Sequence, residues 1–193
     1  MSLENMSIMR TLRNIRLFNP TDEHISRKVA LSFIENPRPI YIQFDPGLQG
    51  TIYEEDKRDI EKGFISNGIS SDITIITYGI WASKLKDEDL PVKLIDCFAL
   101  PVDEEALVKE MSGSKKVITV EDGVSQGGIG SMMLEIMNEK DINIPLKRMA
   151  LEFKNGYPEN LVSREDVFKS EGLTIDMIKW DMKEITQINS LFY

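Results

Sequence analysis

The chain has 193 residues, with 23 lysines and arginines against 32 aspartates and glutamates, which gives a net charge of −9 at pH 7. With 41% hydrophobic and 28% charged residues, its composition is that of an ordinary globular protein and excludes a disordered chain, collagen or a disulfide scaffold. The acidic balance argues against nucleic acid as a partner, because such binding depends on clustered lysine and arginine. No apolar run is long enough to cross a membrane and no signal peptide is visible, so we expect a cytoplasmic protein.

Two single residues restrict the chemistry that the chain could perform. Cys97 is the only cysteine, so an internal disulfide is excluded, and we expect its thiol to be buried. His24 is the only histidine, which excludes zinc sites with two histidines. Near the start of a helix it could touch a substrate, although a surface or inter-domain position is the simpler interpretation because no nucleophile is placed to use it. We predict no catalytic residue and no metal ligand in this chain.

The first 48 residues predict two strands and two helices. In order, we expect a weak helix over residues 3–11, a strand over 15–18, a helix that begins at Thr21 or Asp22, and a strand over 40–44. Apolar residues recur at a spacing of four in the second helix and predict its buried face: Ile25, Val29 and Phe33.

A polar and heavily charged segment follows, over residues 49–61. It is the best candidate for a linker, so we divide the chain into a unit over residues 1–48, a linker over 49–62 and a domain over 63–193. The acidic run Glu54, Glu55 and Asp56 within it could bind a divalent cation, but a solvated linker is the simpler interpretation.

The rest of the chain predicts an alternation of strands and helices. The expected strands cover residues 73–78, 92–95, 117–120 and 147–151. Helices are expected within 79–91 and 103–113, from 129 and from 174, and Ser163 is expected to cap a short acidic turn that ends at Gly172. The strands are continuous β-branched or apolar runs, as in a parallel sheet covered on both faces. We therefore predict a three-layer α/β/α fold with a mostly parallel sheet.

A glycine-rich turn is the most suggestive local feature. Glu121 stands at the carboxyl end of an expected strand, and Gly127, Gly128 and Gly130 lead into the next helix. Ligands of open α/β sheets bind at such places, so a nucleotide site is one alternative. The spacing is not GxGxxG, however, and Glu121 would repel a phosphate. We interpret these four residues as a structural motif that lets the helix lie close against the strand.

Six short motifs occur in order along the chain. They are residues 3–15 (LENMSIMRTLRNI), 19–22 (NPTD), 39–44 (PIYIQF), 72–79 (DITIITYG), 120–131 (VEDGVSQGGIGS) and 171–173 (EGL). In this order and spacing, over residues 3–185, they resemble the transketolase family of thiamine-diphosphate enzymes. That family includes transketolase, deoxyxylulose-5-phosphate synthase and the β subunits of 2-oxo acid dehydrogenases.

The resemblance implies a domain organisation. Residues 1–48 resemble the last third of a pyrimidine-binding domain, and residues 63–193 resemble the whole C-terminal domain. Thiamine diphosphate and Mg²⁺ are the expected cofactors of the full-length enzyme, but this chain lacks the GDG…N motif that holds them and the glutamate that activates the cofactor. The resemblance therefore implies a chain that binds no cofactor alone, is inactive alone, and is either a piece of a longer protein or one subunit of a split enzyme. The expected partners are the missing N-terminal domains or subunit and a second copy of the chain, as in a dimer.

Two departures from the family pattern bear on the substrate. An arginine that binds substrate phosphate in transketolase and the synthase corresponds to Asp45, whose carboxylate would repel phosphate. The family glutamate that follows the aspartate of the second motif is replaced by Ile25. These departures imply a less anionic substrate or a degenerate member, with His24 and Asp45 as the candidate substrate contacts.

Two functions follow from the resemblance. The first is the C-terminal region of a transketolase-like enzyme that transfers a two-carbon unit between sugar-like substrates, with the cofactor performing the chemistry. The alternative is a non-catalytic domain for subunit assembly or carrier docking, as in the β subunits of 2-oxo acid dehydrogenases.

Overall fold

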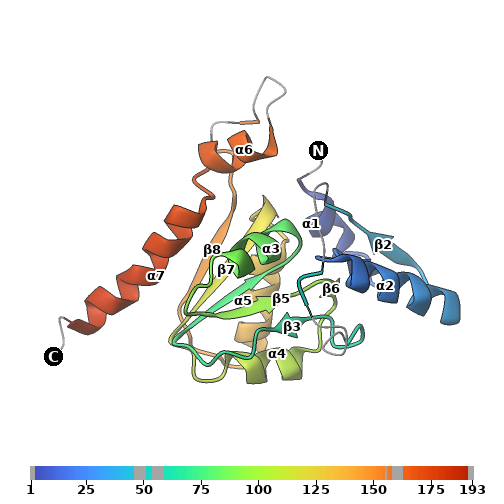
Figure 1. Ribbon diagram of the computed structural model, residues 1–193, viewed down its shortest axis with the longest axis horizontal. Coiled ribbons are helices and arrows are strands. Elements are labelled where there is room, and N and C mark those ends of the chain that lie inside the picture. The colour runs from blue at the N-terminus through green and yellow to red at the C-terminus, as the bar shows by residue number, and fades with distance from the viewer. Residues whose placement is uncertain (1–2, 46–50, 54–58, 155, 158–162, 191–193) are drawn as a thin grey trace.

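The computed structural model describes residues 3–45, 51–53, 59–154, 156–157 and 163–190, the last seven by backbone alone. The helices are α1 (Asn5–Met9), α2 (Glu23–Glu35), α3 (Ile80–Asp87), α4 (Glu104–Met111), α5 (Ile129–Glu139), α6 (Arg164–Ser170) and α7 (Ile175–Ser190). The strands are β1 (Arg16–Phe18), β2 (Ile40–Ile42), β3 (Ile65–Ser66), β4 (Ile73–Thr77), β5 (Lys93–Asp96), β6 (Ala99–Leu100), β7 (Lys116–Val124) and β8 (Leu146–Leu151). The strands form one sheet of five and one of three (Figure 1).

The larger sheet has the strand order β3-β5-β4-β7-β8. β4 pairs in parallel with both β5 and β7, and β7 pairs in parallel with β8. Only the two-residue β3 is antiparallel, at one edge. The prediction of a mostly parallel sheet is confirmed, and its physical basis is the continuous apolar run of β4 and β7, which suits burial on both faces.

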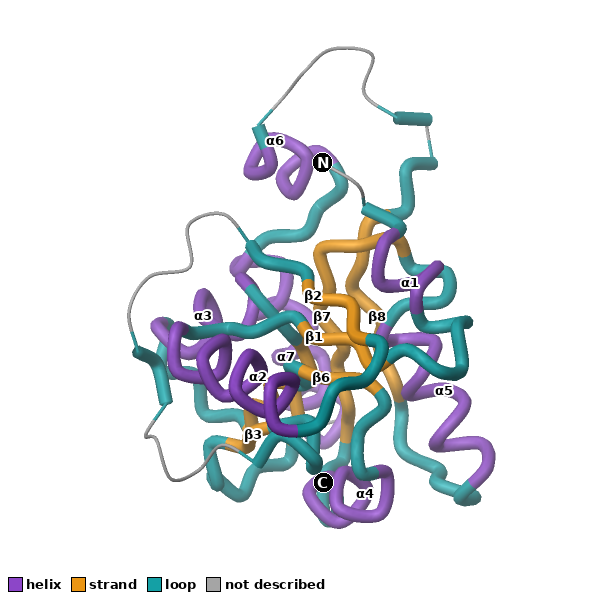
Figure 2. Tube along the Cα trace, turned by 90° about the vertical axis from the view of Figure 1, so that its right-hand side faces the viewer, coloured by secondary structure: helices purple, strands orange, loops and turns teal. Residues whose placement is uncertain are grey.

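Helices cover both faces of the larger sheet, with α3 and α5 on opposite sides of the strands (Figure 2). Successive side chains of a strand point to opposite faces. Ile76 accordingly packs in a cluster with α4 and α5, whereas the adjacent Ile75 packs in a cluster with α3, α6 and α7. Both isoleucines are 0% exposed. The predicted three-layer α/β/α fold is therefore confirmed.

Buried side chains follow the sequence pattern in the larger sheet and its helices. Cys97 is a free, buried cysteine just after β5. The apolar stripe of α5 is buried as a unit: Ile129, Met132, Met133, Ile136 and Met137. These residues form part of the cluster that joins α5 to the sheet, so the methionine-rich stripe belongs to the core.

The smaller sheet contains both strands predicted within residues 1–48 and a third strand, β6, that the sequence did not predict. β1 pairs in parallel with β2 and antiparallel with β6, in the order β2-β1-β6. The two-residue β6 is too short for a sequence pattern to reveal, but its pairing ties residues 16–18 to the part of the chain that follows β5. Phe18, Phe98 and Ala99 share one buried cluster across this junction.

Helix α2 is only partly covered. The carboxylate of Asp22 caps it by accepting a hydrogen bond from the Ile25 amide at 2.8 Å. Ile25 and Val29 are buried as expected, but Phe33 is 41% exposed, so its predicted burial is wrong. The sheet beneath has strands of two or three residues, and the second half of the helix projects beyond it (Figure 1).

The expected linker is described only at residues 51–53 and 59–62. The amides of Ile52 and Tyr53 both donate to Asp22 at 3.3 Å, and the Tyr53 ring is buried in the cluster of the smaller sheet. The acidic run at 54–56, with its candidate cation site, lies outside the described residues. The limits 1–48, 49–62 and 63–193 stay predictions.

Candidate functional site

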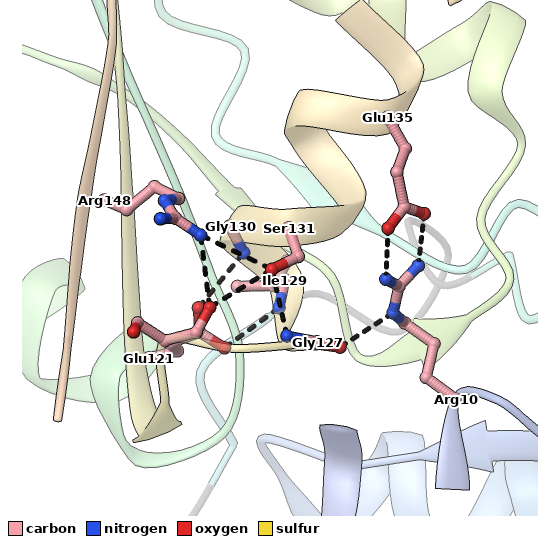
Figure 3. A network of polar contacts seen from close by, with 9 residues as sticks. Arg10, Glu121, Gly127, Ile129, Gly130, Ser131, Glu135 and Arg148 are labelled. Carbon is pink, nitrogen blue, oxygen red and sulfur yellow. Dashed lines mark hydrogen bonds and ion pairs between the residues drawn. The ribbon is translucent and has the colours of Figure 1, made fainter. Parts of the chain in front are cut away.

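The glycine-rich turn places a carboxylate at the start of α5. Glu121, in the last part of β7, accepts hydrogen bonds from the backbone amides of Ile129 at 2.9 Å and Gly130 at 3.1 Å (Figure 3). These amides have no partner within the helix, and the helix dipole favours a negative charge there. The chain's own carboxylate therefore occupies the position that a bound phosphate would take.

Burial governs the ionisation of this carboxylate. Glu121 is 1% exposed, and the loss of water raises its pKa to about 7. The amides of Gly130 and Ile129 oppose that rise, as do the more distant charges of Arg148 and Arg10. Near neutral pH, Glu121 is consequently poised between its neutral and ionised forms.

The glycines of the motif are required by close contacts. A Cβ on Gly128 would lie 1.9 Å from Oε2 of Glu121, and one on Gly130 would lie 2.8 Å from both Thr119 Oγ1 and Arg148 Cδ. Gly127 has a φ of +75°, which side chains rarely adopt. The geometry supports the structural interpretation of Gly127, Gly128 and Gly130.

Arg10 ties the N-terminal segment to this turn. Its Nε donates to the carbonyl oxygen of Gly127 at 2.8 Å, and its two terminal nitrogens donate to the carboxylate of Glu135 at 2.8 and 2.6 Å (Figure 3). The Glu135 hydrogen bond raises the pKa of Arg10, and the same bond lowers the pKa of Glu135. From the sequence, Arg10 stands out only as part of a family motif. No local pattern could connect it to Glu135, because the two residues are far apart in the chain.

A second group of polar side chains lies where the strands of both sheets end. The Asp45 carboxylate accepts a hydrogen bond from the Ile80 amide at the start of α3, at 3.0 Å, and forms an ion pair with Arg164 of α6 at 2.8 Å. Arg164 also pairs with Asp122, which follows Glu121 in β7. The largely buried guanidinium of Arg164 thus forms ion pairs with two buried carboxylates.

The same group includes an asparagine whose side chain has no hydrogen-bond partner among the described residues. Asn19 follows β1 and is 0% exposed, yet neither Nδ2 nor Oδ1 of its side chain has a partner within the described part of the chain. A Cβ on Gly79 would lie 2.3 Å from Oδ2 of Asp45 and 2.7 Å from Oδ1 of Asn19, so these two side chains converge on one point. The carboxyl ends of parallel strands are the usual place for a ligand.

The structure gives the two predicted substrate contacts different surroundings. Asp45 belongs to the group just described. His24 lies in the first turn of α2, where its Nε2 is 3.6 Å from Oε1 of Glu23. The contacts of the described residues do not bring His24 and Asp45 together, and both stay candidate substrate residues.

One buried acid was missed by the sequence analysis. Asp96 ends β5, is 0% exposed, and has no hydrogen bond of normal geometry to either carboxylate oxygen among the described residues. Burial raises its pKa to about 7, opposed by the nearby hydroxyls of Thr21 and Tyr53 and aided by the charge of Asp22. A strand-ending aspartate is the only signal that could have pointed to it.

The described residues do not fit a resident metal ion. No group of three or more histidine, cysteine, aspartate or glutamate side chains within them has the arrangement to hold one. The starts of α3 and α5, where a diphosphate would find backbone amides, are occupied by the carboxylates of Asp45 and Glu121. The described residues therefore do not fit Mg²⁺ or the diphosphate of the cofactor.

Comparison with known proteins decides the family. The family model described as transketolase, C-terminal domain, matches residues 65–169, more than half of the chain. The chain belongs to this family. The matched region holds the whole larger sheet and the candidate residues Glu121, Gly127, Gly128 and Gly130.

Several curated relatives are similar over most of the chain. One of the subunits of the apulose-4-phosphate transketolase of Actinobacillus succinogenes is 28% identical over 185 residues, which cover 92% of this chain and 59% of that protein. The corresponding subunit in Phocaeicola vulgatus is 24% identical and covers 74% of this chain and 49% of that protein. The 1-deoxy-D-xylulose-5-phosphate synthase of Shouchella clausii is 29% identical over 90% of this chain, which spans 29% of the synthase.

Solved structures share the fold. One described as "Split gene transketolase, inactive beta4 tetramer" has a TM-score of 0.76 at 23% identity, covering 92% of this chain and 60% of that one. The transketolase of Campylobacter jejuni has a TM-score of 0.65 at 17% identity, covering 97% of this chain and 28% of the enzyme. The chain thus spans about half of the two apulose-4-phosphate transketolase subunits, and under a third of the synthase and of the Campylobacter jejuni transketolase.

No helix among the described residues is both long and apolar enough to cross a membrane.

Proposed function

We propose that this chain is the C-terminal region of a transketolase-like, thiamine-diphosphate-dependent enzyme that transfers a two-carbon unit between sugar-like substrates. Membership of the transketolase C-terminal domain family supports this proposal, as do relatives named as subunits of a transketolase. Thiamine diphosphate would supply an electron sink for the carbon–carbon bond that is cleaved and formed. The residues that hold this cofactor and Mg²⁺ would come from outside these 193 residues.

The observation that carries the proposal is the incomplete smaller sheet. Its outer strand β2 has no further strand beside it among the described residues, and α2 next to it exposes three large apolar side chains: Leu31 (46%), Phe33 (41%) and Ile34 (71%). An open strand edge next to an apolar patch is typical of a surface that another element covers. We propose that the rest of a pyrimidine-binding domain covers it, either from the same polypeptide or from a partner subunit.

The substrate class follows from the charges at the strand ends. Asp45, Asp122 and Arg164 together carry one net negative charge, and the guanidinium is already shared by both carboxylates. A phosphate brought to this place would be repelled by this net negative charge. We propose a substrate without a phosphate group at this position, with Asp45 as the residue that excludes it.

Calorimetry tests whether the cofactor is bound by this chain or only by its assembly with a partner. We expect no binding of thiamine diphosphate with Mg²⁺ to the isolated chain, and binding once the chain is assembled with the polypeptide that carries the diphosphate-binding motif. Micromolar binding to the isolated chain would contradict the proposal.

The assembly surface is tested by Ile34→Asp with Leu134→Asp as its matched control. Leu134 is a comparably exposed apolar side chain, 47% against 71%, on α5 of the larger sheet. We expect Ile34→Asp to weaken association with the partner in a pull-down by about tenfold or more, and Leu134→Asp to leave it unchanged. Equal effects of the two substitutions would show that α2 is not the contact.

A further inference from the structure

A cavity of about 270 Å³ lies between the segment that joins α1 to β1 and the helices α4 and α5. Its floor consists of buried apolar side chains that also belong to the main core: Leu17, Leu100, Val102, Met132 and Ile136. Neither Asp45 nor Glu121 lines it, and the only residues that it shares with the groups described above are Arg10 and Glu135.

One wall of the cavity is held in place by an ion pair. The guanidinium of Arg10 forms two hydrogen bonds to Glu135 and a third to the Gly127 carbonyl (Figure 3). A planar, doubly bonded pair of this kind is more rigid than a single contact. Because Arg10 and Glu135 neutralise each other, neither supplies a free charge to a ligand.

Three further charged side chains line the cavity, and they have opposite signs: Arg13, Glu104 and Glu139. Arg13 is exposed and forms no hydrogen bond or ion pair with any residue that the structure describes. The hydrogen bond from Lys140 to Glu105 raises the pKa of that lysine, and the charges of Glu104 and Glu139 add to the rise at longer range. Among the described residues, the guanidinium of Arg13 and the carboxylates of Glu104 and Glu139 thus line the cavity without forming a hydrogen bond or ion pair.

We propose that this cavity binds a free α-amino acid with an apolar side chain. The side chain fills the apolar floor, the carboxylate faces Arg13, and the ammonium faces Glu104 and Glu139. Burial of the apolar group supplies most of the affinity, and the two opposite charges orient the ligand.

Size and charge exclude other ligand classes. A cavity of about 150 Å³ holds benzene and drug-sized ligands need about 300 Å³ or more, so 270 Å³ suits a molecule of roughly 10–15 non-hydrogen atoms. A nucleotide is too large and too anionic. An apolar molecule with a single negative charge would satisfy Arg13 but would leave its carboxylate facing Glu104 and Glu139.

Calorimetry with L-phenylalanine on the full chain tests the proposal, with three analogues as further probes. Glycine lacks the apolar group, phenethylamine lacks the carboxylate, and 3-phenylpropionate lacks the ammonium. We expect saturable binding of L-phenylalanine, at least about fivefold weaker binding of the second and third analogues, and none of glycine.

Two variants separate the positive from the negative charges that line the cavity. We expect Arg13→Gln to weaken L-phenylalanine about fivefold while leaving phenethylamine unchanged, and the double change Glu104→Gln with Glu139→Gln to weaken L-phenylalanine similarly while not weakening 3-phenylpropionate. Arg27→Gln, on the exposed surface of α2, is the matched control and should change neither. No saturable heat with L-phenylalanine, equal affinities for all four probes, or an unchanged affinity in Arg13→Gln would overturn the proposal. None of these results would bear on the proposed two-carbon transfer.

Discussion

The two sheets of this protein differ in how much apolar surface each buries with its own helices. The larger sheet has strands of up to nine residues and is covered by helices on both faces. The smaller sheet has strands of two or three residues, an open edge at β2 among the described residues, and a helix whose second half projects past it. Apolar burial grows with the area covered, so the larger sheet holds the fold while the smaller one depends on its neighbours.

The largest expected effect compares the same substitution in each sheet. Ile118 in β7 is 0% exposed, whereas Ile40 in the edge strand β2 is only partly buried. We expect Ile118→Ala to lower the free energy of unfolding by about 2–5 kcal/mol and Ile40→Ala to lower it by about 1 kcal/mol. Urea denaturation measures both. Equal losses would show that the two sheets form one core of uniform strength.

The junction between the sheets should show itself in the pH dependence of stability. Asp96 ends β5 and lies near Asp22, the residue that caps α2, and its pKa of about 7 is above the ordinary value of 3.8. Between these values the folded state binds more protons than the unfolded state, so the free energy of unfolding falls as the pH rises from about 4 to about 7. Glu121, with a pKa of about 7, acts in the same direction.

Asp96→Asn removes one of these two contributions. We expect this variant to be more stable than the parent by about 4 kcal/mol at pH 8, with little difference near pH 4, because the buried side chain no longer has to ionise. Urea denaturation across this pH range measures the slope, and Asp87→Asn, exposed on α3, is the control. A slope unaltered by Asp96→Asn would place the titrating group elsewhere.

Close packing of α5 on the larger sheet gives a third test. A Cβ on Gly128 would lie 1.9 Å from the Glu121 carboxylate, so we expect Gly128→Ala to cost about 2 kcal/mol of unfolding free energy. In a Glu121→Ala background the clash is absent, and the same substitution should cost about 1 kcal/mol less. An unchanged cost in that background would assign the effect to the backbone rather than to the carboxylate.

The smallest expected effect concerns surface ion pairs. Glu61 accepts hydrogen bonds from Arg16 at 2.6 Å and Arg38 at 2.9 Å beside the smaller sheet, and 67% of its side chain is exposed. Solvent screens such pairs, so Glu61→Gln should cost under about 1 kcal/mol, and less in high salt. Glu165→Gln, which removes the pair with Lys84 beside the larger sheet, should cost the same. A larger loss for Glu61→Gln in urea denaturation would mean that ion pairs compensate for the small core of that sheet.

Sequence reasoning succeeded where a signal was local and repeated. The run over residues 73–78 predicted β4, and the stripe of α5 predicted its buried face. The predicted cap at Ser163 is present, although the segment that it starts is the helix α6 rather than a short turn. Sequence reasoning failed at Phe33, because a spacing of four shows which side chains share a helix face but not how far the surface beneath extends. The sequence also did not predict β6, because a strand of two residues is too short to show an alternating pattern.

The candidate site divides in the same way. The glycine motif with Glu121 was visible because its parts lie within ten residues of one another. The pairing of Asp45 with Arg164 joins residues 119 apart in the sequence, and no pattern short of the fold reveals it.

By itself, the sequence determined the fold class, the order of the elements and the family resemblance, because these depend on the local alternation of apolar and polar residues and on short motifs. Only the tertiary structure decided which carboxylates cap a helix, which form an ion pair and which are buried without a hydrogen bond. Such contacts depend on distances between segments remote in the chain, and burial then decides the pKa of each group, as it does for Asp96 and Glu121.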